Sequence, residues 1–99
     1  MFEKFLNTKV IVRTERAGAF YGILSAIVGG EAIIKSCRRL WYWDGAASLS
    51  QLAAEGVKKP QNCKFSVTLP ELGLRGVIEV LPVSVEAAEI IEKVPVWKV

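Results

Sequence analysis

Histidine is absent from this chain of 99 residues. The usual general base is therefore missing, and neither a Ser–His nor a Cys–His nucleophilic pair can form. Cysteine is scarce: Cys37 and Cys63 form no C-x-x-C pair, and two thiols are fewer than the ligands of a zinc site. We expect two reduced, buried thiols, with a single disulfide as the alternative, and we expect no metal and no cofactor.

Other signals of catalysis and of export are also missing. There is no Walker loop and no G-x-G-x-x-G pattern. The carboxylates Glu86, Glu89 and Glu92 follow one face of an expected helix, where solvation explains them. No run of about 18 apolar residues is present to span a membrane, and residues 1–6 are too short and too charged for a secretory signal. The sequence predicts a soluble, non-enzymatic protein with one domain over residues 1–99.

The composition is apolar and mildly basic. Hydrophobic residues make up 52% of the chain, which excludes long disorder and favours self-association, so we expect a homo-oligomer. The net charge is +3, and residues 1–64 hold ten basic against five acidic residues. This excess suits an anionic partner such as a phosphate, but it is too small for duplex nucleic acid.

Short alternating segments rich in β-branched and aromatic residues predict strands, and two segments predict helices. Ser48 and Ser84 are expected to cap these helices, and Pro70 and Gly73 to break a strand. Gly22 suggests a bend, and Gly29 and Gly30 a hairpin in which both have positive φ. Expected strands cover residues 9–14, 19–28, 31–36, 38–43, 63–69 and 74–81, and expected helices cover residues 46–55 and 85–94. The fold class is α+β, mainly antiparallel β: a small bent sheet or SH3/Sm-like barrel with two short helices.

Alternation within the expected strands assigns residues to faces. In residues 19–28, one face carries Phe20, Leu24, Ala26 and Val28, and the other carries Tyr21, Ile23 and Ile27. In residues 38–43, one face carries Arg39, Trp41 and Trp43, and the other carries Arg38, Leu40 and Tyr42. The two adjacent arginines therefore point to opposite sides, so that one can be structural while the other reaches a ligand.

Residues 38–51 contain the parts of a nucleotide pocket without hydrolytic machinery. Guanidinium groups grip phosphate, aromatic rings stack on bases, and a helix start with small residues and hydroxyl groups accepts an anion. Arg13, at the end of a strand, is the other basic residue in a suggestive setting. The candidate ligand-binding residues are Arg38, Arg39, Trp41, Trp43, Ser48, Ser50, Gln51 and Arg13.

Each of these residues also has a structural interpretation. Trp41 and Trp43 suit a core or a subunit interface, because large aromatic side chains dominate both. Ser48 is explained as a helix cap, and the arginines as salt-bridge partners or surface residues.

The motif RRLWYWxGAASLSQLA of residues 38–53, together with residues 10–14, 17–18 and 77–82, resembles a family of small uncharacterised proteins encoded by bacteriophages and prophages. The resemblance covers nearly the whole chain. It implies a phage protein acting in the cytoplasm of an infected bacterium, as an anti-defence factor, a host-enzyme inhibitor or a minor particle component. One anti-defence class consists of oligomeric sponges that bind nucleotide signals of bacterial immunity without catalysis.

Three functions follow as hypotheses. The first is a non-catalytic, oligomeric binder of a small anionic ligand such as a nucleotide signal. The second is an interaction protein, either an inhibitor of a host protein or a structural phage component, with no small-molecule ligand. The third is weak binding of single-stranded nucleic acid through stacked aromatic side chains.

Overall fold

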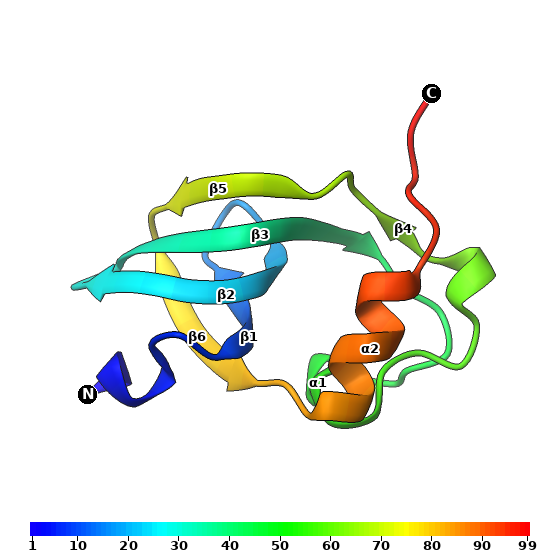
Figure 1. The fold of residues 1–99 in the computed structure, drawn as a ribbon, viewed down its shortest axis with the longest axis horizontal. Coiled ribbons are helices and arrows are strands. Elements are labelled where there is room, and N and C mark those ends of the chain that lie inside the picture. The colour runs from blue at the N-terminus through cyan, green and yellow to red at the C-terminus, as the bar shows by residue number, and fades with distance from the viewer.

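The computed structural model describes residues 1–99 as six strands, two α-helices and two short 3-10 helices (Figure 1). The strands are β1 (Lys9–Thr14), β2 (Ala19–Val28), β3 (Glu31–Tyr42), β4 (Lys64–Phe65), β5 (Leu69–Leu74) and β6 (Val77–Pro82). The helices are α1 (Leu49–Glu55), α2 (Val85–Lys93), η1 (Phe2–Phe5) and η2 (Pro60–Asn62). The expected α+β class, with mainly antiparallel strands and two short helices, is confirmed. No helix is long and apolar enough to cross a membrane.

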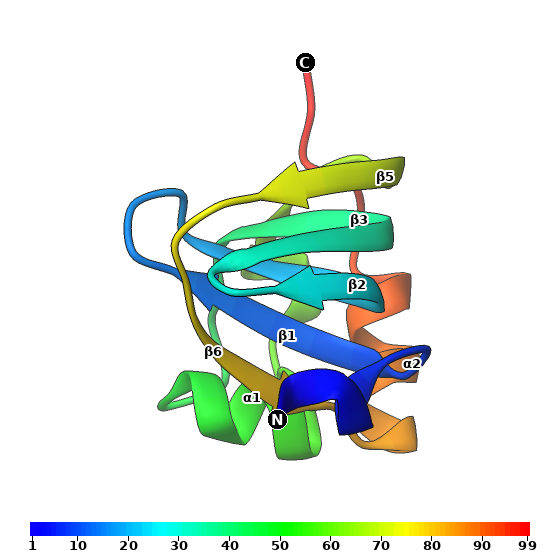
Figure 2. The same ribbon diagram turned by 90° about the vertical axis from the view of Figure 1, so that its left-hand side faces the viewer.

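The six strands form one bent, open, antiparallel sheet. Its order is β4-β3-β2-β1-β6, and β5 also pairs with β3. The bend brings the turn between β5 and β6 beside the turn between β1 and β2, as Figure 2 shows. There the backbone N–H of Glu15 donates to the carbonyl of Gly76 at 2.7 Å. This bond joins the two turns, whereas the outer strands β5 and β6 do not pair with each other.

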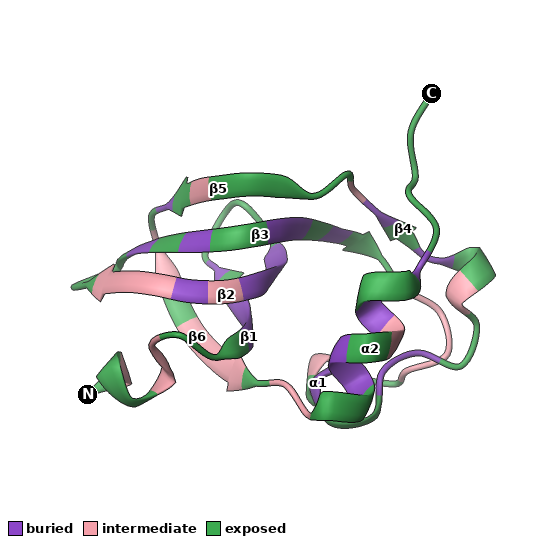
Figure 3. Cartoon of the chain, viewed as in Figure 1, coloured by how far each residue is buried: buried purple, intermediate pink, exposed green.

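Both faces of the central strands are buried, which gives the protein two hydrophobic clusters (Figure 3). Val10 and Val12 of β1 point into the concave side of the sheet, where they join Phe20, Leu24, Ile34 and Leu74. Ile11, between them, points to the other side and joins residues of both helices. That second cluster also contains Tyr21, Leu40, Leu52, Phe65, Ala88 and Ile91. The helices therefore cover the convex face, and the sheet itself wraps the first cluster.

Three bulges change the facing of residues that simple alternation predicts. Leu24 pairs with Ile34 and Ala26 pairs with Ile33, so Ser25 is an extra residue on β2 and Ile27 packs on the cluster of Phe20. The expectation that Ile27 opposes Phe20 is wrong, because a bulge residue shifts every later side chain by one place.

Ser36 forms a second bulge, with a positive φ of 51°. The chain stays paired on both sides of Ser36, so residues 31–36 and 38–43, expected as two strands, form the single strand β3. The same feature bends the sheet opposite Gly22.

Three further expectations, about two strand ends and one hairpin, are wrong. Pro70 and Gly73 lie inside β5 rather than breaking a strand, because β5 is at the edge of the sheet and a proline there loses no ladder bond. The chain turns instead at Arg75 and Gly76, where Gly76 has a φ of 70°. In the β2–β3 hairpin only Gly29 has a positive φ, of 59°, and Gly30 does not.

Ser48 and Ser84 cap the helices α1 and α2, as expected. The Ser48 hydroxyl accepts a hydrogen bond from the Gln51 N–H, and the Ser84 hydroxyl accepts one from the Ala87 N–H. After α2 the tail packs on this domain: Val96 bridges Phe65, and the Trp97 N–H donates to the Phe65 carbonyl at 2.9 Å. Both cysteines are free and buried, as expected.

The bend at Gly22 provides a test of the fold. A Cβ at this position would lie 2.5 Å from Ile34 Cγ2 and 2.7 Å from the carbonyl oxygen of Lys35. We expect Gly22→Ala to lower the free energy of unfolding by about 1–3 kcal/mol through overpacking. The measurement is the urea midpoint at unchanged m-value. Gly73→Ala is the matched control, because a Cβ there meets nothing within 4 Å. Equal midpoints for the two variants would contradict the account of the bend.

Candidate anion-binding site

Arg38 is a buried structural residue. Its side chain is only 2% exposed, and it lies over the ring of Phe65, 5.5 Å from the centroid. Nε donates to the Ser66 carbonyl at 2.9 Å, Nη1 to the Ile91 carbonyl at 2.8 Å and Nη2 to the Phe65 carbonyl at 3.3 Å. The Ile91 carbonyl belongs to the last turn of α2, where it also accepts from the Val94 N–H at 3.3 Å. Burial lowers the pKa of Arg38. All three guanidinium nitrogens therefore hold the backbone together.

Arg39 points to the other side of the strand and is exposed, so the two arginines do face opposite ways. Its guanidinium lies over Phe20, 4.8 Å from the ring centroid, and it forms no ion pair. Ser66 fixes the backbone of Arg39 on both sides: the Arg39 N–H donates to the Ser66 hydroxyl at 2.7 Å, and the Arg39 carbonyl accepts from the Ser66 N–H at 3.0 Å. Arg39 is thus an anchored cation that faces solvent.

Arg39 lines a hollow of about 380 Å³ between the β1–β2 turn and the end of β5. We call it the arginine hollow, because Arg16 and Arg75 line it as well. Arg16 has no carboxylate partner, and Arg75 forms only an exposed pair with Glu31 at 3.3 Å. Its lining consists of Glu15, Arg16, Ala17, Arg39, Leu72, Gly73, Leu74, Arg75 and Gly76. Three cations from three separate elements therefore face one hollow that has a single carboxylate in its lining.

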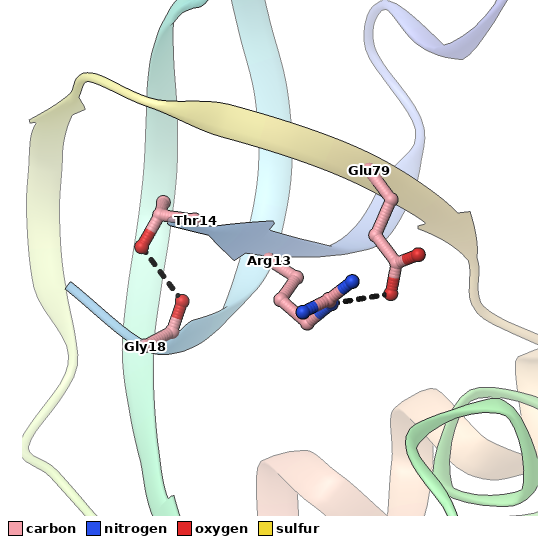
Figure 4. Close-up of polar contacts among 4 residues, drawn as sticks. All are labelled: Arg13, Thr14, Gly18 and Glu79. Atoms are coloured by element: carbon pink, nitrogen blue, oxygen red, sulfur yellow. Dashed lines mark hydrogen bonds and ion pairs between the residues drawn. The ribbon is translucent and has the colours of Figure 1, made fainter. Parts of the chain in front are cut away.

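A hydrogen-bonded turn holds Arg16 in place (Figure 4). The buried Thr14 hydroxyl donates to the Gly18 carbonyl at 2.9 Å and accepts from the Ala17 N–H at 2.9 Å. The bond from Glu15 to Gly76 then joins this turn to the one that carries Arg75. Arg13, expected as a candidate, lies outside the hollow lining and pairs with Glu79 at 2.8 Å (Figure 4).

Trp41 and Trp43 lie in different environments. Trp41 is the bulge residue opposite β4 and is 65% exposed, whereas Trp43 is half-buried against the cluster that contains Leu40. The expectation that Trp41 and Trp43 share a face is wrong, because the bulge at Trp41 moves Trp43 to the side of Leu40. Neither tryptophan lines the arginine hollow.

Trp41, Tyr42 and Trp97 form an exposed aromatic surface near β4 and the tail. Lys64 Nζ lies 5.9 Å from the ring centroid of Tyr42 and 5.4 Å from that of Trp97. Tyr42 is 49% and Trp97 is 52% exposed. We refer to these three residues as the aromatic surface.

The start of α1 is not part of the arginine hollow. Ser48 and Gln51 are occupied in the cap, where the Gln51 side-chain oxygen accepts from the Ala47 N–H at 2.7 Å, and Ser50 is exposed. Both views place α1 at the opposite edge of the molecule from β5 (Figures 1 and 2). The structure thus separates the predicted helix-start residues from Arg39.

Sequence reasoning missed Arg16 and Arg75. Each lies in a turn, and only the bend of the sheet brings the two turns together. The Gly18 turn and the predicted bend were the available signals. The position of the second turn was hidden, because Gly73 and not Gly76 was expected to break the chain.

A polar cluster next to Arg38 ties α2 to the sheet. The Tyr21 hydroxyl donates to the Glu92 carboxylate, and Lys9 Nζ lies 2.8 Å from the same carboxylate. The hydrogen bonds from Lys9 and Tyr21 lower the pKa of Glu92, while burial and then Glu92 raise the pKa of Tyr21. Glu92 therefore has a structural role beyond the solvated helix face expected for it.

The fold and the hollow together define a small α+β domain with an arginine-lined hollow at the open side of a bent sheet. The chain belongs to a family described as a domain of unknown function, DUF6948, whose model matches residues 7–91. The comparison with curated proteins gave no match.

Adjacent arginines with different roles provide a second test. Arg38→Met removes three hydrogen bonds to backbone carbonyls, although the Phe65 and Ile91 carbonyls keep the Trp97 and Val94 N–H groups as donors. We therefore expect the free energy of unfolding to fall by about 2–4 kcal/mol. Arg39→Met removes only the contact with Phe20, for which we expect a loss of about 1 kcal/mol or less. Urea titration of both variants measures the difference, and a larger loss for Arg39→Met would reverse the assignment.

Proposed function

We propose that this protein is a non-catalytic binding protein that holds a small anionic ligand, a nucleotide signal of bacterial immunity, in the arginine hollow. The observation that carries the proposal is the grouping of Arg16, Arg39 and Arg75 around one hollow. Two of these cations have no carboxylate partner, and the third has only an exposed one. Such a grouping repels itself unless an anion is present, so it favours a phosphate-containing ligand.

The site is suited to binding rather than to turnover. The chain has no histidine, and Glu15 is the only carboxylate in the lining of the hollow. The backbone that carries these cations lies in hydrogen-bonded turns and in a strand, and the Arg39 guanidinium also rests on Phe20. Preorganised cations lower the ordering cost of binding and give affinity without a chemical step.

The cellular setting forms part of the same proposal. The resemblance of residues 38–53 to phage and prophage proteins supports an origin in a phage and action in the cytoplasm of its bacterial host. In that setting, tight binding without hydrolysis sequesters an immune signal. An oligomeric sponge with one hollow per chain is the form of the protein that we propose.

Calorimetric titration tests the ligand. We expect heat of binding with at least one member of a panel of cyclic di- and trinucleotides and cyclic ADP-ribose isomers. Arg39→Gln and Arg16→Gln should each weaken that binding about tenfold or more, since each removes roughly 1.4 kcal/mol or more of a charge-assisted contact.

Arg13→Gln is the matched control for this titration, because Arg13 is an exposed arginine on β1 outside the hollow lining and pairs with Glu79. It should bind as the unaltered chain does. The absence of heat with every ligand of the panel, or equal weakening by all three variants, would overturn the proposal.

A second candidate function is an interaction protein, either a host-protein inhibitor or a structural phage component. The aromatic surface favours it, because exposed Trp and Tyr side chains are typical of interface centres.

Sedimentation equilibrium tests whether the aromatic surface mediates self-association. We expect sedimentation equilibrium to give a mass above that of one chain, and the double variant Trp41→Ser, Trp97→Ser to sediment as a monomer with nearly unchanged urea midpoint. Arg39→Gln should keep the oligomer. A monomeric unaltered chain would remove the aromatic surface as a self-association site.

A further inference from the structure

A second hollow lies next to the arginine hollow and differs from it in chemistry. It has a volume of about 370 Å³ and is lined mainly by aliphatic side chains at the end of the β2–β3 hairpin and of β5. We call it the apolar hollow. Its lining consists of Ala26, Ile27, Val28, Glu31, Ala32, Ile33, Gly73, Leu74 and Arg75.

Strand pairing explains the shape of the apolar hollow. Ala26 pairs with Ile33, and Ile33 pairs with Gly73, so the three residues form one row across β2, β3 and β5. Ile33 is part of the outward face of the sheet, while its neighbour Ile34 is buried on the concave side. In this row the large side chain of Ile33 lies between the methyl group of Ala26 and Gly73, which has no side chain. Ile27, Ala32 and Leu74, which belong to the concave cluster or pack on it, line the same hollow, so it lies at the end of the β2–β3 hairpin and of β5 and is bordered by residues of both faces.

Gly73, Leu74 and Arg75 line both hollows. The arginine hollow also touches Leu72, which with Leu74 packs on the concave cluster. The apolar hollow touches the outward-facing Ile33. A ligand that occupies both hollows therefore passes over the backbone of β5 at Gly73, where no side chain stands in the way.

The fold itself gives no reason for glycine at position 73. Its φ is not positive, and a Cβ there would meet nothing within 4 Å. Gly22 and Gly76, in contrast, are explained by close backbone contact and by positive φ. Glycine weakens a strand, and in a strand it often marks the close approach of a ligand. The missing side chain leaves the backbone of β5 open at this position.

We propose that the ligand is a nucleoside phosphate bound across Gly73, with its phosphate in the arginine hollow and its base in the apolar hollow. The inference rests on the proposed function and specifies its ligand. Aliphatic side chains provide contact for the faces of a base. β5 pairs only with β3, so its outer edge offers free backbone N–H and C=O groups to the polar edge of a base. An alkyl chain would leave these backbone groups without partners.

Arg75 connects the two parts of this site. It lines both hollows and pairs with Glu31 across the neighbouring strand. A bound phosphate competes with Glu31 for this guanidinium. If Arg75 leaves Glu31 to bind the phosphate, the rim of the apolar hollow opens. The Arg75 side chain therefore links phosphate binding to access to the apolar hollow.

Gly73→Val tests the arrangement, because a β-branched side chain suits a strand and the position is open. The probes are inorganic pyrophosphate, the ribonucleoside monophosphates and hexyl phosphate, titrated calorimetrically. In the unaltered chain we expect a nucleoside monophosphate to bind about tenfold or more tighter than hexyl phosphate. Gly73→Val should remove that advantage. Ala26→Leu, at a position outside the lining of the arginine hollow, should remove it and leave pyrophosphate binding unchanged, whereas Arg39→Gln should weaken both.

Glu71→Val is the matched control, because it places the same side chain two residues away on the same strand and outside both linings. It should retain nucleotide binding. Ala26→Leu fills the apolar hollow from β2 and should repeat the effect of Gly73→Val, which keeps the test decisive if one variant does not fold.

The outcomes separate the two proposals. If neither pyrophosphate nor any nucleotide binds, the proposed function fails, and this inference fails with it. If pyrophosphate binds but nucleotides bind no tighter, or if Gly73→Val and Ala26→Leu leave nucleotide binding intact, only the two-part site is overturned. If hexyl phosphate binds as tightly as the nucleotides, the apolar hollow accepts an aliphatic chain and the assignment of a base to it is overturned.

Discussion

The close contact between Gly22 of β2 and the backbone of β3 is the constraint on which the rest of the structure depends. A Cβ at Gly22 would lie 2.7 Å from the Lys35 carbonyl oxygen, so the strands approach as they do only because no side chain is present. The bulge at Ser36 lies directly opposite and adds the extra residue that lets β3 follow the bend. This bend wraps the sheet around Phe20 and Leu24, and it brings together the two turns that form the arginine hollow.

The division of work between Arg38 and Arg39 follows from the same strand. Adjacent residues of a strand face opposite sides, so one guanidinium enters the helix-covered side and the other reaches the concave side. Arg38 donates to the Ile91 carbonyl in the last turn of α2 and to the Phe65 and Ser66 carbonyls at the end of β4, and a buried cation in that position is tolerated because backbone oxygens surround it. Arg39 remains exposed over Phe20. Alternation alone separates the structural arginine from the one available to a ligand.

The sequence was sufficient for features that depend on a few neighbouring residues. Both helix caps, the limits of β1 and β2 and the opposite facing of Arg38 and Arg39 follow from local chemistry and alternation. The bulges at Ser25, Ser36 and Trp41 could not be predicted in the same way, because a bulge depends on the pairing of two strands rather than on one of them. They account for the misplaced Ile27 and Trp43 and for the joining of two expected strands into β3.

The candidate site was predicted only in part, for a related reason. Arg39 was found because it belongs to a conspicuous aromatic and basic segment. Arg16 and Arg75 are isolated arginines in turns, and their nearness depends on the bend of the sheet and on the hydrogen bond from Glu15 to Gly76. The helix start at Ser48 attracted the prediction because it is a recognisable local motif, yet the chain carries it to the far edge of the molecule (Figure 1).

The two surfaces that remain after the fold is explained do not compete for the same space. The apolar hollow is at the β2–β3 hairpin, whereas β4 and the tail, which carry most of the aromatic surface, are at the other end of the long axis (Figure 1). Association of chains through Trp41, Tyr42 and Trp97 would therefore leave the apolar hollow open. Association through this surface and ligand binding in the apolar hollow therefore use opposite ends of the fold.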